Sequence, residues 1–140
     1  MRFMMMVRAN RHTEAGVMPE EKLIAAMGKY NEEMAKAGVL LDAAGLQPSS
    51  KGARIQFSGG KPAVIDGPFA ETKELIAGYW LIQVKSKEEA VEWAKRCPAP
   101  HGEATEGVLE LRQLFELDDF PPSEAIEAAR KLEQELARKK

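Results

Sequence analysis

The sequence contains a single cysteine, Cys97, among its 140 residues. One thiol cannot form an intramolecular disulfide, so cross-links do not hold the fold together and nothing indicates an oxidising compartment. No apolar run approaches the roughly 20 residues that a membrane-spanning helix needs. The apolar run at 3–7 is too short for a secretory leader and is followed by Arg8 and Arg11. We therefore expect a cytoplasmic protein with no membrane partner.

An excess of positive charge is also missing. The formal net charge is −2, and the basic cluster Arg138-Lys139-Lys140 is confined to the tail. Nucleic-acid binding rests on basic surfaces that neutralise phosphates, so we expect no nucleic-acid partner. The sequence has no GxGxxG, P-loop, HExxH or paired CxxC motif. These absences give nucleotide and zinc sites no support, and we expect neither a cofactor nor a metal.

What is present is the pattern of one α+β domain. Hydrophobic periodicity and turn residues predict strands at 2–8, 39–46, 53–58, 62–65, 75–84 and 108–117. Helices are predicted from Pro19 to a stop at Gly38, at 86–96 and at 122–139, and 9–18 is predicted as a loop. The run at 75–84 is almost wholly apolar, which favours the central strand. Gly59-Gly60 predicts a tight hairpin, whose first strand we expect to be half-buried.

This order is βαββαβ, a ferredoxin-like arrangement, with an inserted hairpin and a C-terminal helix. It predicts an antiparallel sheet with both main helices on one face. The other face has nothing in the chain to cover it except the last helix, so a second copy is expected there. We place the domain at 1–120 and treat 121–140 as its helical extension.

The longest motif is Asp66-Gly67-Pro68-Phe69-Ala70-Glu71-Thr72-Lys73-Glu74, followed by Ile76-Ala77-Gly78-Tyr79-Trp80. With the flanking segments at 1–4, 38–41 and 92–98, it resembles the signature of the DGPF group within the YCII-related family over about residues 1–117. The resemblance implies a dimeric α+β barrel, a homodimer in which two sheets pack face to face. It implies little about the reaction. Some relatives resemble small-molecule enzymes with a His–Asp pair in a cleft, and others are encoded beside sigma factors.

The predicted topology gathers the only two histidines and the signature at one end of the sheet. Histidine is the side chain best suited to proton transfer near neutral pH. We therefore take Asp66, His12 and His101 as candidate catalytic residues. The alternative for Asp66 is a structural role, because Asp-Gly-Pro is good turn chemistry in which Asp bonds backbone N–H groups and Gly takes positive φ. The alternative for each histidine is an ordinary loop residue without a functional role.

Four residues complete the candidate site as substrate-binding groups: Lys73, Arg112, Glu71 and Tyr79. Lys73 or Arg112 could hold an anionic group of a substrate. Glu71 and Lys73 could equally form a solvated surface cluster, and Arg112 could pair with a carboxylate on an adjacent strand. Cys97 is expected to be inert packing, since a nucleophilic thiol needs a neighbouring base.

Two functions compete on these observations. The first is a small-molecule enzyme that uses acid–base chemistry, such as an elimination, isomerisation or hydrolysis, in a cleft at one end of the sheet. The second is a non-catalytic ligand-binding or protein-interaction module in a sigma-factor pathway. An enzyme should hold Asp66 in a closed pocket, whereas an interaction module should expose a large apolar patch outside the dimer face.

Overall fold

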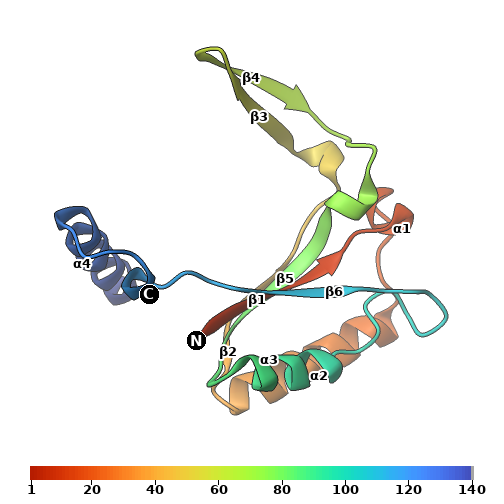
Figure 1. Cartoon of the computed structure of the whole chain (residues 1–140). Helices are drawn as coiled ribbons and strands as arrows, with labels where there is room; N and C mark the ends of the chain where they lie inside the picture. Colours follow the sequence, from red (N-terminus) through yellow and green to blue (C-terminus); the bar gives the residue numbers. More distant parts are fainter. Residues whose placement is uncertain (140) are drawn as a thin grey trace.

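A computed structural model describes residues 1–139 and shows a four-stranded sheet with two helices on one face, from which two further elements project (Figure 1). The sheet contains β1 (Arg2–Arg8), β2 (Leu40–Gly45), β5 (Ile76–Gln83) and β6 (Leu109–Gln113). The strand order is β2-β5-β1-β6, and all neighbours are antiparallel. This is the predicted ferredoxin-like α+β fold, with the apolar run at 76–83 in a central strand as expected.

Helices α2 (Glu21–Lys36) and α3 (Lys87–Lys95) cover one face of the sheet (Figure 1). Alternate residues of β1 and β5 point toward them, because side chains alternate across a strand. Met5, Ile82 and Met34 are fully buried at the centre of this layer. Helix α2 ends where predicted, since Gly38 follows it with φ +75°. Ser86 caps α3 by accepting a hydrogen bond from the Glu89 N–H.

Aromatic groups lock α2 to the sheet and to α3. The Trp80 indole donates to Asn31 on α2 at 2.7 Å, and its ring meets Tyr30 edge-on at 5.7 Å between centroids. The Tyr30 hydroxyl donates to the Trp93 carbonyl at 2.6 Å. Burial raises the pKa of Tyr30 well above its usual range, so the hydroxyl keeps the proton that it donates.

The segment between β1 and α2 differs from the prediction. Residues 9–18 were expected to form a loop, but Arg11–Glu14 form a short helix, α1. Asn10 and Thr13 cap it reciprocally, each side chain accepting a hydrogen bond from the other residue's backbone N–H. Four residues with no apolar period leave no signal in a hydrophobicity pattern, whereas this capping box stabilises the turn locally.

The hairpin formed by β3 (Ala53–Ser58) and β4 (Lys61–Asp66) stands clear of the sheet, on the side away from α2 and α3 (Figure 1). Its turn at Gly59-Gly60 is as predicted, with positive φ at both glycines. The expectation that its first strand is half-buried was wrong, because every residue of both strands is exposed. The alternation of Ile55 and Phe57 with polar residues is real, but both apolar side chains are exposed in the single chain.

The C-terminal helix α4 (Glu124–Arg138) also stands apart, beyond the end of the sheet opposite the hairpin (Figure 1). It packs mainly on the 3₁₀ turn η3 (Leu117–Asp119), where Arg130 pairs with Asp118 at 3.1 Å. Phe115, predicted to lie in the last strand beside Leu109 and Leu111, follows the shorter β6 and is exposed. The last helix therefore does not cover the free face of the sheet, which stays open in the single chain.

Removing one buried hydroxyl tests this core. We expect Tyr30→Phe to lower the free energy of unfolding by about 1–3 kcal/mol, because the Trp93 carbonyl loses its donor in a buried place. Ser58→Ala is the control, since its hydroxyl is exposed on the polar side of the hairpin. Urea unfolding should show a change below roughly 0.5 kcal/mol for the control. Equal effects of the two variants would contradict the role given to Tyr30.

Candidate functional site

At one end of the sheet, β1 and β2 end while β5 and β6 begin. Backbone hydrogen bonds join the neighbouring segments just beyond the strands. Arg8 N–H donates to the Val108 carbonyl at 3.0 Å, and Ala9 N–H donates to the Leu75 carbonyl at 3.0 Å. This end therefore gathers α1, the signature segment at 66–75 and the loop at 98–108, which are the three segments predicted to meet there. His12, Asp66 and His101 lie on these three segments, but no hydrogen bond or ion pair within residues 1–139 joins one of them to another.

The signature segment is held through Ser49 of the 3₁₀ turn η1 (Ser49–Lys51). Ser49 Oγ accepts a hydrogen bond from the Phe69 N–H at 3.0 Å and donates to the Glu14 carboxylate. The same carboxylate accepts from the Ser49 N–H at 2.9 Å. Glu14 and Ser49 thus connect α1 to the signature, and sequence reasoning missed both. They lie 35 residues apart and belong to no motif, so a single sequence carries no signal for the contact.

Gly67 has a different role from the one predicted. A turn glycine with positive φ was expected, but Gly67 is not among the residues with positive φ. A Cβ at Gly67 would lie 1.8 Å from the Ser49 carbonyl oxygen, so only glycine fits this close approach of two backbones. Gly67 N–H also donates to the Gly52 carbonyl at 3.1 Å. The signature therefore packs backbone against backbone on the η1 turn.

The ionisable side chains of the signature face outward. Asp66, Glu71, Lys73 and Glu74 are exposed, and the Asp66 carboxylate takes part in none of the side-chain hydrogen bonds within residues 1–139. The structural alternative, in which Asp66 accepts backbone N–H groups of its own turn, is thus without a contact to support it. Arg54 of β3 stacks on the Phe69 ring at 3.9 Å and lies 4.0 Å from Glu74.

The two histidines have different environments. His12 is exposed on α1. His101 is half-buried, and its Nε2 lies 2.9 Å from the Arg8 carbonyl oxygen. A carbonyl can only accept, so Nε2 carries a proton and donates it. In the neutral ring the other nitrogen, Nδ1, is then unprotonated and able to accept a proton from a ligand.

The face of the sheet turned away from α2 and α3, called the open face below, combines apolar and ionisable groups. Register places two rows of side chains across it: Arg112, Met4, Leu81 and Asp42, then Glu110, Met6, Tyr79 and Ala44. Glu110 lies between Arg8 at 3.3 Å and Arg112 at 3.6 Å. Arg112 thus contacts a carboxylate of its own strand, rather than of an adjacent one. An apolar centre with a few polar groups around it is typical of ligand sites once such a surface is covered.

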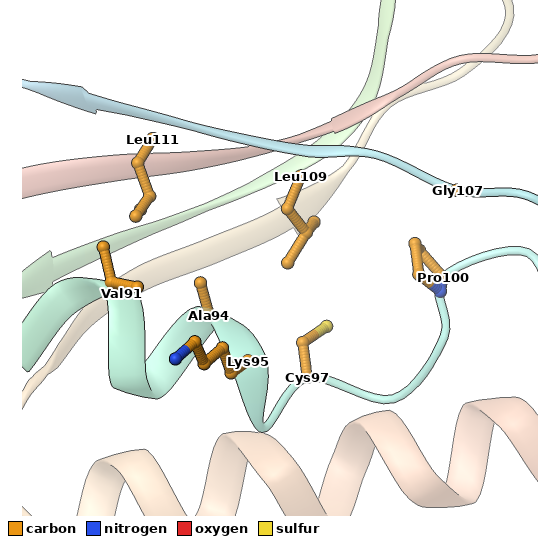
Figure 2. Close-up of a pocket in the computed structure, with 8 residues that line it drawn as sticks. All are labelled: Val91, Ala94, Lys95, Cys97, Pro100, Gly107, Leu109 and Leu111. Carbon is orange, nitrogen blue, oxygen red and sulfur yellow. The ribbon is translucent and has the colours of Figure 1, made fainter.

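Two open hollows lie elsewhere. One, of about 480 Å³, lies between α3 and β6, and Figure 2 shows residues that line it, among them Val91, Ala94, Cys97, Leu109 and Leu111. A second, of about 550 Å³, lies against the start of α4. None of the seven predicted site residues lines either cavity. Burial raises the pKa of Cys97 to about 12, so its thiol stays protonated, in agreement with the inert role expected for it.

Within residues 1–139 no group of three or more His, Cys, Asp or Glu side chains is arranged to hold a metal ion. Among the helices described, none combines the length and the apolar character needed to cross a membrane.

Comparison with known proteins supplies the family. The model of the YCII-related domain matches residues 1–118. The chain belongs to the YCII-related family. An uncharacterised protein of Rhizobium meliloti (strain 1021) is 36% identical over 76 residues, which are 54% of this chain and 61% of that protein. The match thus spans less than two thirds of the relative, and α4 lies outside the family match.

A substitution at Gly67 tests the packing of the signature in this YCII-related domain. We expect Gly67→Ala to lower the free energy of unfolding by roughly 1–3 kcal/mol or more, because the new methyl group forces the η1 and signature backbones apart. Gly28→Ala is the control, since a Cβ there meets nothing within 4 Å. In the middle of α2 this change should raise stability by up to about 1 kcal/mol. Thermal or urea unfolding distinguishes the two, and a Gly67→Ala variant as stable as the parent would contradict the close approach.

Proposed function

We propose that the protein is a homodimer joined through the open faces of its sheets, and that it binds a small molecule at the signature end, where histidine and carboxylate groups carry out acid–base chemistry. The observation that supports this most is the makeup of the open face. Met4, Met6 and Leu81 form an apolar centre beside Tyr79, with ionisable groups at its edges. Covered by a second sheet, this surface becomes a partly polar interior.

The exposed area supports the second copy. A compact monomer of 15.5 kDa is expected to expose about 7,200 Å². The single chain exposes 10,439 Å², roughly 3,200 Å² above the expectation. A standard interface covers about 800 Å² on each partner, and obligate homodimers cover more. The excess is thus large enough for an obligate dimer.

In the proposed site, His101 acts through Nδ1, because Nε2 is engaged with the Arg8 carbonyl. Asp66 serves as a second base or orients the ligand, and His12 contributes from α1. Lys73 and Arg112 hold an anionic group, while Glu71 and Tyr79 supply polar contacts. All seven lie on the open face or on the segments at the signature end of the sheet.

A second candidate is the non-catalytic interaction module. The hairpin favours it, since Phe57 is 81% and Val64 is 67% exposed. Exposed apolar clusters of this kind mark protein contacts. A sigma-factor pathway is then one setting for the protein, with ligand binding as its signal.

The dimer is tested by placing a charge on the open face. We expect Met6→Glu to convert the dimer to a monomer at micromolar concentration, because it buries an unpaired carboxylate between the sheets. Ile24→Glu, on the exposed side of α2, is the control and should leave the mass unchanged. Light scattering on the parent and both variants provides the measurement. A parent that is monomeric would refute the dimer.

The ligand site is tested by removing the charge of the exposed Asp66 carboxylate. A thermal-shift screen of metabolites against the parent identifies a ligand by its stabilisation of the folded state. We expect Asp66→Asn to raise the dissociation constant of that ligand at least about tenfold, which is a loss of about 1.4 kcal/mol or more in binding free energy. The melting temperature of the free protein should change little. Glu32→Gln, on the exposed side of α2, should bind as the parent does.

Once a ligand is identified, the enzyme and the non-catalytic module can be distinguished by measuring its turnover and its binding. His101→Gln should abolish turnover and leave binding within a few-fold if the site is catalytic. If the parent binds the ligand without converting it under any condition tested, the interaction module is the better description. If Asp66→Asn binds as tightly as the parent, the site is misplaced.

A further inference from the structure

Two apolar surfaces outside the open face have no partner in the described chain. The first is one side of the hairpin. Cross-strand register pairs Ile55 with Val64 and Phe57 with Pro62, and paired residues share a side of the ribbon. The opposite side pairs Arg54 with Ile65, Gln56 with Ala63 and Ser58 with Lys61, so four of its six residues are polar. The hairpin is therefore amphipathic, although neither side is covered.

The second surface is a stripe along α4. Ala125, Ala129, Leu132 and Leu136 recur at intervals of four, three and four residues, which places them on one side of a helix. Leu132 and Leu136 are 55% and 54% exposed. Arg130 joins α4 to Asp118 of η3, and Ala129 of the stripe is half-buried, whereas the two leucines are left exposed.

Neither element is expected to hold its shape without a partner. An isolated two-stranded hairpin is marginally stable in water and needs a packed face. A helix of 15 residues is likewise marginal unless its apolar side is buried. Both elements are nevertheless regular over their full lengths. A covering surface would stabilise each element.

We propose that the apolar side of the hairpin, formed by Ile55, Phe57, Pro62 and Val64, docks on the α4 stripe of a second copy of this chain. The sizes agree: six residues of strand span about 20 Å, and 15 residues of helix span about 22 Å. The two elements leave the sheet at opposite ends, and the hairpin stands on the open-face side (Figure 1). A two-fold axis that stacks the open faces and reverses the strand direction brings the hairpin of one copy to α4 of the other.

The exposed area favours a second copy over an unrelated protein as the occupant. A standard interface covers about 800 Å² on each partner, so a contact of that size through the open faces leaves most of the roughly 3,200 Å² of excess surface uncovered. The symmetric contact adds two hairpin–helix pairs to each dimer and satisfies both elements with surfaces of the same chain. The hairpin–helix contact rests on the proposed dimer, so the experiment distinguishes a failure of this contact from a failure of the dimer itself.

The experiment is site-directed cross-linking between two differently tagged chains, each carrying Cys97→Ala. One chain carries Val64→Cys and the other Leu132→Cys. After mild oxidation we expect a covalent heterodimer on a non-reducing gel. Ala63→Cys in place of Val64→Cys is the matched control, because it lies one residue away on the opposite side of the ribbon. It should cross-link at most about a tenth as much.

Three results would overturn the proposal. Cross-linking of Val64→Cys chains with each other, but not with Leu132→Cys, would mean that hairpin meets hairpin. If the parent is dimeric by light scattering but the cysteine variants form no cross-link, the hairpin–helix contact is refuted and the dimer is retained. A monomeric parent would refute both the dimer and the hairpin–helix contact. A stable complex of the hairpin with an unrelated protein would then show what covers the hairpin.

An independent measurement is the concentration dependence of the dimer. Phe57→Asp should raise the dimer dissociation constant about tenfold or more, because it removes a large apolar side chain from the contact. Ser58→Asp is the control on the polar side of the same strand. Because each residue is exposed in the single chain, neither change should unfold the sheet. Equal dissociation constants for the two variants would contradict the docking.

Discussion

The sheet of this chain carries apolar side chains on both faces, and its own helices cover only one face. Alternation along β1 sends Phe3, Met5 and Val7 under α2 and α3, and it necessarily sends Met4 and Met6 to the other side. A face of this kind is costly to leave in water, since each buried apolar side chain is worth about 1.5–3 kcal/mol. The proposed dimer and the proposed ligand site both depend on what covers that face.

The signature is first of all a packing motif in this structure. Its glycine admits the Ser49 carbonyl, and its Phe69 N–H is bound by the Ser49 hydroxyl, which Glu14 orients from α1. These contacts explain the small residue and the turn, but they do not involve the charged groups that accompany them. Asp66, Glu71 and Lys73 face solvent at the same end of the sheet. Their position is what leaves them available to a ligand.

The sequence predicted what local patterns determine. The run at 76–83 had to be central because both of its faces are apolar, and Gly38 had to end a helix because it tolerates positive φ. The family and the ferredoxin-like strand order followed from the motif and the order of elements. Non-local contacts left no such trace. Period-two alternation in β3 is the same whether Ile55 and Phe57 meet a core or a partner, so the pattern could not show that the hairpin leaves the sheet. The predicted gathering of loops at one end is seen, but the positions of their side chains depend on contacts such as that of His101 with Arg8, which no spacing reveals.

The hairpin links the two proposals physically. Asp66 is the last residue of β4, at the base of the hairpin, and Phe57 lies near its tip. Arg54 of the same hairpin stacks on Phe69, so the ribbon and the signature segment are connected through side chains as well as through the chain. A tip held by a second copy therefore restricts the angle at which the base leaves the sheet, and with it the position of the Asp66 carboxylate. In the proposed dimer, assembly of the two chains therefore positions the ligand site. A substitution at the tip of the hairpin weakens dimerisation, and through it weakens ligand binding at the base. A change at Asp66 weakens ligand binding first, because Asp66 pairs with Ala53 at the base of the ribbon, beyond the four residues of the docked surface.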